Sequence, residues 1–149
     1  MSWRSVPRIG LLVLDGFLAV SAIAGAFLVV PTMPMEWLKA GPFTDWTIPA
    51  IALGFVGFLA AAAFLAVLRR PWLGAVASVV VGVGIIVFEL VEIGVVGWTL
   101  SDPGPSYFPS WLQLIYLIVG SIQVLLGIRL WLATRDAAPV PPIIHPAAA

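Results

Sequence analysis

The sequence predicts an all-α membrane protein in which four transmembrane helices form an antiparallel up-down bundle. Of its 149 residues, 62% are hydrophobic and only 9% are charged, which is too apolar for a soluble domain of this length. Four apolar runs reach the roughly 20 residues that a helix needs to cross a bilayer. All seven tryptophans lie at or just beyond the ends of these runs, as expected of an aromatic belt at headgroup depth.

The four predicted spans are separated by segments rich in turn residues. They cover residues 9–30, 48–68, 72–98 and 111–132. The first run continues beyond Ala22-Ile23-Ala24, which favours a retained helix over the alternative of a signal peptide cleaved after that triplet. In the second, Gly54 and Gly57 predict a close-packing surface. The spans belong to one domain, residues 1–135, and a Pro- and Ala-rich stretch predicts a disordered tail over residues 136–149.

The basic residues predict how the bundle is oriented. All of the arginines lie on one side of the predicted bundle or at its edge, and only Lys39 lies on the other. The positive-inside rule therefore predicts a plasma-membrane protein with both termini and the Arg69–Arg70 turn in the cytoplasm. The arginines are scattered along the chain, so they give no reason to expect nucleic acid as a partner.

The residue types that carry most membrane chemistry are missing from the spans. The chain has no cysteine, and its single histidine, His145, lies in the tail. Thiolate or imidazole metal sites and bis-histidine haem are therefore not expected, and the sequence predicts no cofactor and no metal site. No phosphate-binding loop or nucleophile elbow is present, so no catalytic residue is predicted.

Three acidic residues, Asp15, Glu89 and Glu92, lie within the predicted spans. Each costs about 3 kcal/mol in hydrocarbon, so each should face the bundle interior or a wet cavity. From the helical rise, Asp15 lies roughly 9 Å from the cytoplasmic edge, and Glu89 lies roughly 13 Å below the outer end of its helix. The glutamates and Asp15 therefore belong to opposite leaflets and cannot share one compact site.

Two stripes of small and polar residues run along the third and fourth spans at helical spacing. The stripe of the third span is Ser78, Gly82, Ile85, Glu89, Glu92 and Val96, and that of the fourth is Gln113, Tyr116, Gly120, Gln123 and Gly127. Small residues allow close backbone approach and amides can hydrogen-bond across the contact, so we expect the two stripes to face each other.

The facing stripes predict a candidate ligand-binding site at the outer end of the bundle. Its residues are Glu89, Glu92, Gln113 and Tyr116. Three structural alternatives remain open. Gln113 also completes a capping box with Ser110, Glu92 can tilt toward headgroup water, and Glu89 can hydrogen-bond to Tyr116 or Gln123. At the other end, Asp15 and Arg129 have matched depths, which predicts a structural ion pair between the first and last helices.

The order of these features resembles an uncharacterised family of small four-helix bacterial integral membrane proteins. The resemblance spans roughly residues 31–132 and rests on Gly41-Pro42-Phe43-Thr44-Asp45, Ile48-Pro49, the acidic stretch at residues 88–93, and Ser110-Trp111-Leu112-Gln113 with Tyr116 and Gly120. Family members often have a proline where this chain has Leu114. The resemblance implies membrane location and a four-helix fold, and it implies no activity. For a bacterial protein, the predicted plasma membrane is the inner membrane.

These observations favour a non-enzymatic integral membrane protein, either an accessory or interaction subunit or a lipid-associated bundle. Its expected partners are the lipid bilayer and either another membrane protein or a second copy of the chain. The alternative is a small carrier or ligand-binding protein that uses an outward-facing acidic pocket at Glu89 and Glu92. A tightly packed interior around Glu89 favours the first reading, and a polar cavity there favours the second.

Overall fold

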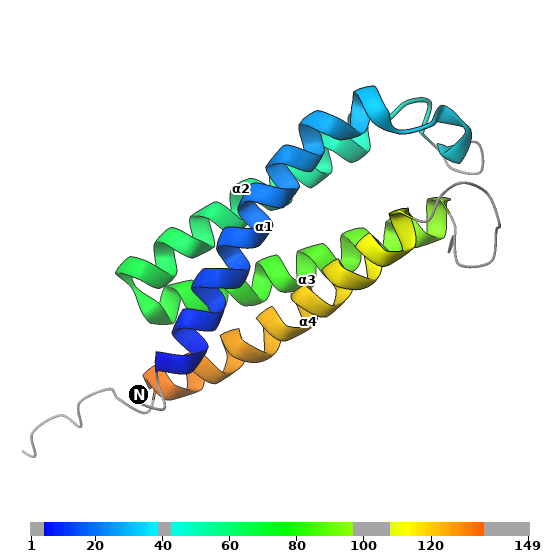
Figure 1. Cartoon of the computed structure of the whole chain (residues 1–149). Helices are drawn as coiled ribbons and strands as arrows, with labels where there is room; N and C mark the ends of the chain where they lie inside the picture. The colour runs from blue at the N-terminus through cyan, green and yellow to red at the C-terminus, as the bar shows by residue number, and fades with distance from the viewer. Residues whose placement is uncertain (1–4, 39–42, 97–107, 136–149) are drawn as a thin grey trace, which may run out of the picture.

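The structure, a computed structural model, describes residues 5–38, 43–96 and 108–135. Four long helices account for nearly all of them (Figure 1). These are α1 (Ser5–Thr32), α2 (Thr47–Arg69), α3 (Pro71–Val96) and α4 (Phe108–Arg135), with one short 3-10 helix, η1 (Met35–Leu38). Each long helix is apolar enough to cross a membrane, so the prediction of four membrane-spanning helices in an all-helical fold is supported by length and composition.

The helices extend beyond the predicted spans at most ends. For example, α4 begins at Phe108 rather than at Trp111. Residues 97 and 98, at the end of the predicted third span, lie outside the described residues, as does the predicted tail over residues 136–149.

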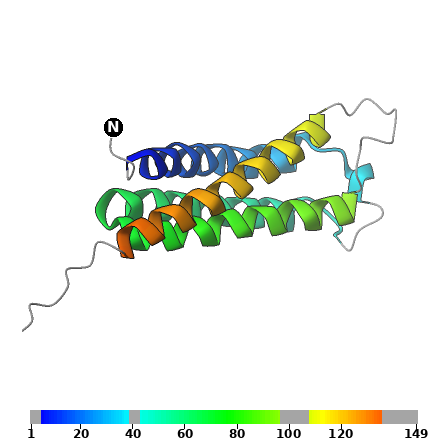
Figure 2. The same ribbon diagram turned by 90° about the horizontal axis from the view of Figure 1, so that it is seen from below.

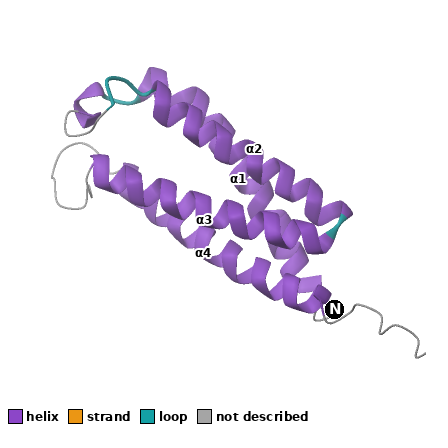
Figure 3. Cartoon of the chain, turned by 180° about the vertical axis from the view of Figure 1, so that it is seen from behind, coloured by secondary structure: helices purple, strands orange, loops and turns teal. Residues whose placement is uncertain are grey.

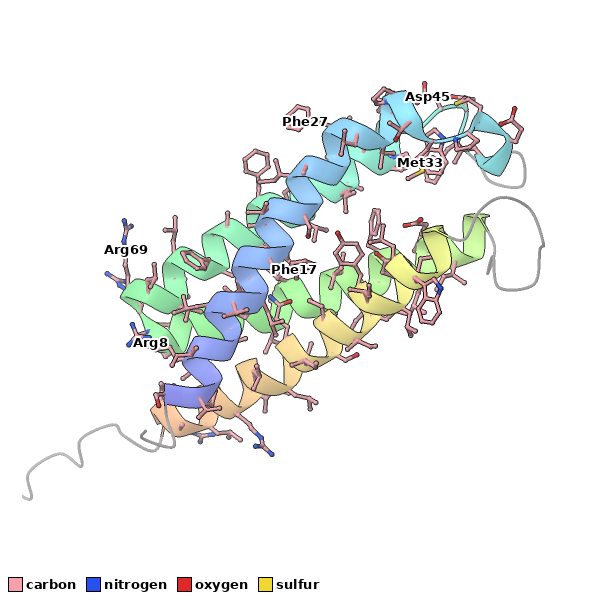
Figure 4. All side chains as sticks on the ribbon, in the orientation of Figure 1. Arg8, Phe17, Phe27, Met33, Asp45 and Arg69 are labelled. Carbon is pink, nitrogen blue, oxygen red and sulfur yellow. The ribbon has the colours of Figure 1, made fainter. Side chains whose placement is uncertain are left out.

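The four helices are arranged as two hairpins, α1 with α2 and α3 with α4, whose consecutive helices run in opposite directions (Figure 1). The hairpins lie side by side at one end of the molecule and diverge at the other (Figure 3). Seen from below, α4 crosses the bundle obliquely (Figure 2). We call the packed end the arginine end, because Arg8 and Arg69 both lie there, and the other the divergent end, where Met33 and Asp45 lie (Figure 4).

Small residues bring the helices of each hairpin into close contact. A Cβ added to Gly57 of α2 would lie 2.9 Å from the backbone nitrogen of Ile23 in α1. In the other hairpin, a Cβ on Gly82 would lie 2.8 Å from the carbonyl oxygen of Gly120. Backbones this close admit only glycine, so the glycines of the predicted stripes fix where the helices cross.

A tight turn at Arg70 joins the two hairpins at the arginine end. The Arg70 N–H donates to the Ala66 carbonyl at 2.7 Å, and Pro71 begins α3, where its missing N–H is not needed. Arg8 of α1 donates from Nη2 to the Leu68 carbonyl at 2.9 Å, which satisfies one of the free carbonyls at the end of α2. A cation at a helix C-terminus is also favoured by the helix dipole.

Two clusters of buried apolar residues hold the hairpins together. One lies midway along the bundle and draws on all four helices, including Leu18, Ala60, Ile85 and Tyr116. The other lies toward the arginine end and contains Leu11, Val67, Ala75 and Leu130. On the outside, large apolar side chains such as Phe27, which points away from the bundle in Figure 4, are exposed along every long helix. An apolar exterior of this extent suits hydrocarbon rather than water.

The structure describes the side chains of four tryptophans, and these differ in exposure. Trp72, Trp111 and Trp131 are exposed near helix ends. Trp46, in contrast, is only 5% exposed, and its indole N–H donates to the Pro34 carbonyl at 3.2 Å. Trp46 thus lies directly before α2, at the end of the span as predicted, but its side chain is buried at the divergent end.

Candidate functional site

Buried polar side chains lie along the interior of the bundle, from its middle toward the divergent end. Those with almost no exposure are Asp15, Ser78, Glu89, Gln113 and Gln123. All except Asp15 belong to the two predicted stripes, and Gly82 of one stripe meets Gly120 of the other at close range. The prediction that the stripes of α3 and α4 face each other is therefore confirmed for their described members.

Asp15 takes partners other than the one the sequence suggested. Its carboxylate accepts a hydrogen bond from the Ser78 hydroxyl at 2.8 Å and another from the Gln123 side-chain amide. Arg129 is exposed, and within the described residues it forms no ion pair with Asp15. The Asp15–Arg129 pair is therefore corrected to a neutral-donor cluster of Asp15, Ser78 and Gln123, which joins α1, α3 and α4.

Arg129 does not reach Asp15 because of the direction in which its side chain leaves the α4 axis. Gln123, Gly127 and Leu130 recur at spacings of four and three and are buried, so they mark the inner face of α4. Arg129 does not belong to this series, so it points outward in spite of its matching depth.

Gln113 lies inside α4 and does not begin it. The helix starts at Phe108, so Ser110 occupies helical backbone and cannot cap the helix in the manner of a capping box. The Gln113 side chain is 2% exposed, and its Nε2 donates to Glu92 Oε1 at 3.5 Å. The capping alternative is therefore wrong, and Gln113 links α4 to the acidic segment of α3.

Glu89 is a buried group whose hydrogen bonding is incomplete. Its side chain is 2% exposed, and its Oε2 has no hydrogen-bond partner among the described residues. Gln123, one of its two suggested partners, binds Asp15 instead. Asp15 and Glu89 are separated as predicted, because Ser78 precedes Glu89 on α3 by eleven residues, about 16 Å of helix.

A cavity of about 160 Å³ lies where the hairpins diverge, and all four candidate ligand-binding residues line it. Its polar wall is Glu89, Glu92, Gln113 and Tyr116. The rest is apolar or aromatic and comes from Val29, Met33, Leu38, Phe43, Trp46, Ile48, Pro49, Ala52, Leu53, Phe88, Val91 and Leu112. The site therefore draws on all four long helices, η1 and the segment before α2.

The polar wall is held in place from behind by contacts with α1. The Tyr116 ring packs against Phe17, with ring centroids 6.3 Å apart. Tyr116 is 7% exposed and belongs to the central apolar cluster, so its ring is held in place where it lines the cavity. A rigid supporting shell of this kind is typical of binding sites that are formed before the ligand arrives.

The aromatic residues that line this cavity beside Tyr116 were not predicted from the sequence. Trp46 and Phe43 lie in a connecting segment, and Phe88 is one of many apolar residues in α3. Two signals were available in the sequence. Phe88 adjoins Glu89, and the indole N–H of a buried tryptophan such as Trp46 usually finds a hydrogen-bond partner.

The donor set of the cavity determines which chemistry it can support. Within residues 5–38, 43–96 and 108–135, no three His, Cys, Asp or Glu side chains gather closely enough to hold a metal ion. The cavity offers two carboxyl groups, one amide and one phenol. This arrangement can accept hydrogen bonds and compensate a positive charge.

Comparisons of the chain with protein-family models, with curated proteins and with solved structures found no match. The resemblance to a family of small bacterial membrane proteins is therefore not supported by a family model. The function has to be argued from the site itself.

Proposed function

We propose that this chain is a non-enzymatic integral membrane protein that binds a small, largely apolar ligand in the cavity between its two hairpins. The observation that carries the proposal is that the divergent end contains a cavity, lined by buried polar side chains, where a purely structural bundle would be packed. The cavity is close in size to an engineered protein cavity of about 150 Å³ that binds benzene. A ligand with about one aromatic ring is therefore the right size.

We further propose that the cavity opens on the outer side of a bacterial plasma membrane. The support is the distribution of arginines, because Arg8, Arg69, Arg70 and Arg135 lie at helix ends opposite the cavity. Both termini are then cytoplasmic. Because the helices pack closely at the arginine end, a ligand would reach the cavity from the divergent end only. A carrier, in contrast, needs access to its site from both sides of the membrane.

The experiment uses a cavity-filling variant with a matched control on the same helix. Ala52 lines the cavity, whereas Ala62 is exposed on the outer face of α2. Binding of fluorinated propylbenzene and fluorinated phenethylammonium is followed by fluorine NMR in phosphatidylcholine nanodiscs, with empty nanodiscs as the reference. We expect saturable binding of at least one probe to the wild type and to Ala62→Phe, and loss of that binding in Ala52→Phe.

Two results would overturn the proposal. One is that neither probe binds saturably to the wild type, and the other is that Ala52→Phe binds as the wild type does. The accessory-subunit reading predicts a different result, a stoichiometric protein partner retained on purification in mild detergent from native-level expression. The same preparations analysed by mass spectrometry show whether a protein or a small molecule accompanies the chain.

A further inference from the structure

The polar wall of the cavity contains two buried acceptor atoms that nothing in the described structure satisfies. These are Oε2 of Glu89 and Oε1 of Gln113, on side chains that are each 2% exposed. The Gln113 amide already donates to Glu92, so its oxygen is the atom left free. A buried acceptor without a donor is costly, which makes a ligand that donates hydrogen bonds a better occupant than a pure hydrocarbon.

The charge of the wall favours a donor that is also a cation. Glu89 and Glu92 both line the cavity, and no lining residue within the described ranges is basic. Trp46, Phe88 and Tyr116 line the same cavity, and aromatic rings attract cations placed over their faces. Charge-assisted hydrogen bonds to a carboxylate are about twice as strong as neutral ones, so the ammonium form of an amine gains from both features.

The remainder of the lining indicates an organic cation rather than a metal ion. Ca²⁺ takes six to eight oxygen ligands and Mg²⁺ requires six in a near-ideal octahedron. Here the oxygens lie on one side only, and the opposite wall is made of Val29, Leu53, Trp46 and other apolar residues. An occupant that matches both walls has a compact charged head and an apolar body.

We propose that the cavity selects a primary ammonium group carried on an apolar body of about one aromatic ring, with its N–H groups directed to Glu89 and Gln113. This inference rests on the proposed ligand-binding function and names the class of ligand. The same chemistry can come from a free alkyl- or arylamine or from the headgroup of an aminophospholipid. The experiment is arranged to separate these two sources.

Three probes of similar shape separate charge from hydrogen bonding. Phenethylammonium is charged and donates, phenethyl alcohol donates without charge, and propylbenzene does neither. In the wild type in phosphatidylcholine nanodiscs, we expect phenethylammonium to bind at least about tenfold more tightly than the alcohol, because its hydrogen bonds to the carboxylate are charge-assisted. This comparison needs no variant, so it does not depend on whether any substitution folds.

Variants then locate the charge. Glu89→Gln should weaken the binding of phenethylammonium at least about tenfold, since it removes the negative charge and one of the two acceptor oxygens. It should change the affinity for propylbenzene less than about twofold, because propylbenzene uses neither. Glu36→Gln is the control, because Glu36 is an exposed carboxyl at the same end of the molecule that does not line the cavity. We expect it to leave all three affinities unchanged.

The outcomes are distinguishable from a failure of the proposed function. Equal affinities for the ammonium and the alcohol, or an unchanged ammonium affinity in Glu89→Gln, would overturn the ammonium proposal while leaving a neutral-ligand site intact. If neither phenethylammonium nor propylbenzene binds, the proposed function itself fails. Adding phosphatidylethanolamine to the nanodiscs then identifies the source, because competition indicates a lipid headgroup and no competition indicates a free amine.

Discussion

At the residue scale, Asp15 and Glu89 show how two buried carboxyl groups in one membrane bundle take different roles. Both oxygens of Asp15 accept hydrogen bonds, one from Ser78 and one from Gln123. Glu89 has an oxygen without a partner and borders a cavity. The first arrangement stabilises the fold, because both carboxylate oxygens of Asp15 are paired with donors from other helices. The second leaves a carboxyl group available to a ligand.

The role of Asp15 predicts a large loss of stability when its carboxylate is removed. Asp15→Ala would leave the Ser78 hydroxyl and the Gln123 amide unpaired in an apolar interior, which should lower the free energy of unfolding by about 1–3 kcal/mol. Asp15→Asn keeps one acceptor oxygen, so it should lower the free energy of unfolding by less than Asp15→Ala does. The measurement is reversible unfolding in mixed detergent micelles, with each variant compared against the wild type.

Arg129 provides the control for this account of Asp15. Because Arg129 is exposed and does not pair with Asp15, Arg129→Gln should change the free energy of unfolding by less than about 0.5 kcal/mol. A loss in Arg129→Gln as large as that in Asp15→Ala would instead indicate that the two residues form the ion pair expected from their depths.

The sequence could predict the burial of these side chains but not all of their partners. Spacing along a helix determines which residues share a face, and it placed Glu89, Gln113 and Gln123 inward correctly. Depth alone selected Arg129 for Asp15, and depth does not fix rotation about the helix axis. Partners across helices depend on how far each helix is rotated and shifted, which one sequence does not specify.

At the element scale, the packing of α3 on α4 depends on backbone contact at glycine. Gly82 and Gly120 approach each other so closely that a methyl group on Gly82 would meet the Gly120 carbonyl oxygen at 2.8 Å and Val124 Cγ2 at 2.9 Å. Backbone cannot give way as a flexible side chain can, so a larger residue here must push the helices apart.

This contact predicts different effects for alanine at two glycines of the same helix. Gly82→Ala should destabilise the protein by about 1–3 kcal/mol through overpacking. Gly84→Ala is the matched control, because a Cβ there meets nothing within 4 Å, and alanine favours helix by up to about 1 kcal/mol. Thermal unfolding of both variants checks the prediction, and equal behaviour of the two would show that α3 does not pack on α4 through this face.

The start of α2 predicts a pH dependence local to that element. The backbone N–H of Thr47 donates to Asp45 Oδ1 at 2.8 Å, and this hydrogen bond holds the pKa of Asp45 below its ordinary value of 3.8. A carboxyl group whose pKa is lowered by folding stabilises the folded form above its unfolded pKa. That contribution is lost as the pH falls through the folded pKa.

We therefore expect the amide of Thr47 to lose hydrogen-exchange protection as the pH is lowered from about 6 to about 3. The protection is to be corrected for the pH dependence of intrinsic exchange. In Asp45→Asn the side chain still accepts the hydrogen bond but does not titrate. The protection of the Thr47 amide should therefore stay constant over the same pH range. A decline of equal size in the variant would assign the effect to another group.

At the scale of the whole molecule, the divergence of the two hairpins creates the candidate site. Residue patterns predicted the number and type of helices and the facing stripes, because both follow from apolar length and helical spacing. They did not predict that the hairpins would separate, since the angle between packed helices depends on how their surfaces fit. Nor did they place Trp46 and Leu38, which reach the cavity from the connecting segment.

The absence of cysteine from the chain allows the cavity to be probed one position at a time. Ala52 lines the cavity, whereas Ala63 is fully buried in the central apolar cluster on the same helix. A single cysteine at either position can be labelled with a water-soluble, positively charged methanethiosulfonate reagent. The labelling rate reports access from water, and its change in the presence of phenethylammonium reports occupation of the cavity.

The most direct test of the cavity is therefore the labelling rate of Ala52→Cys with and without phenethylammonium, with Ala63→Cys as the reference. The structure predicts that Ala52→Cys is labelled much faster than Ala63→Cys and that the amine slows only the former. If Ala52→Cys is labelled no faster than Ala63→Cys, or if the amine does not slow it, the divergent end does not contain an accessible binding site and the account is contradicted.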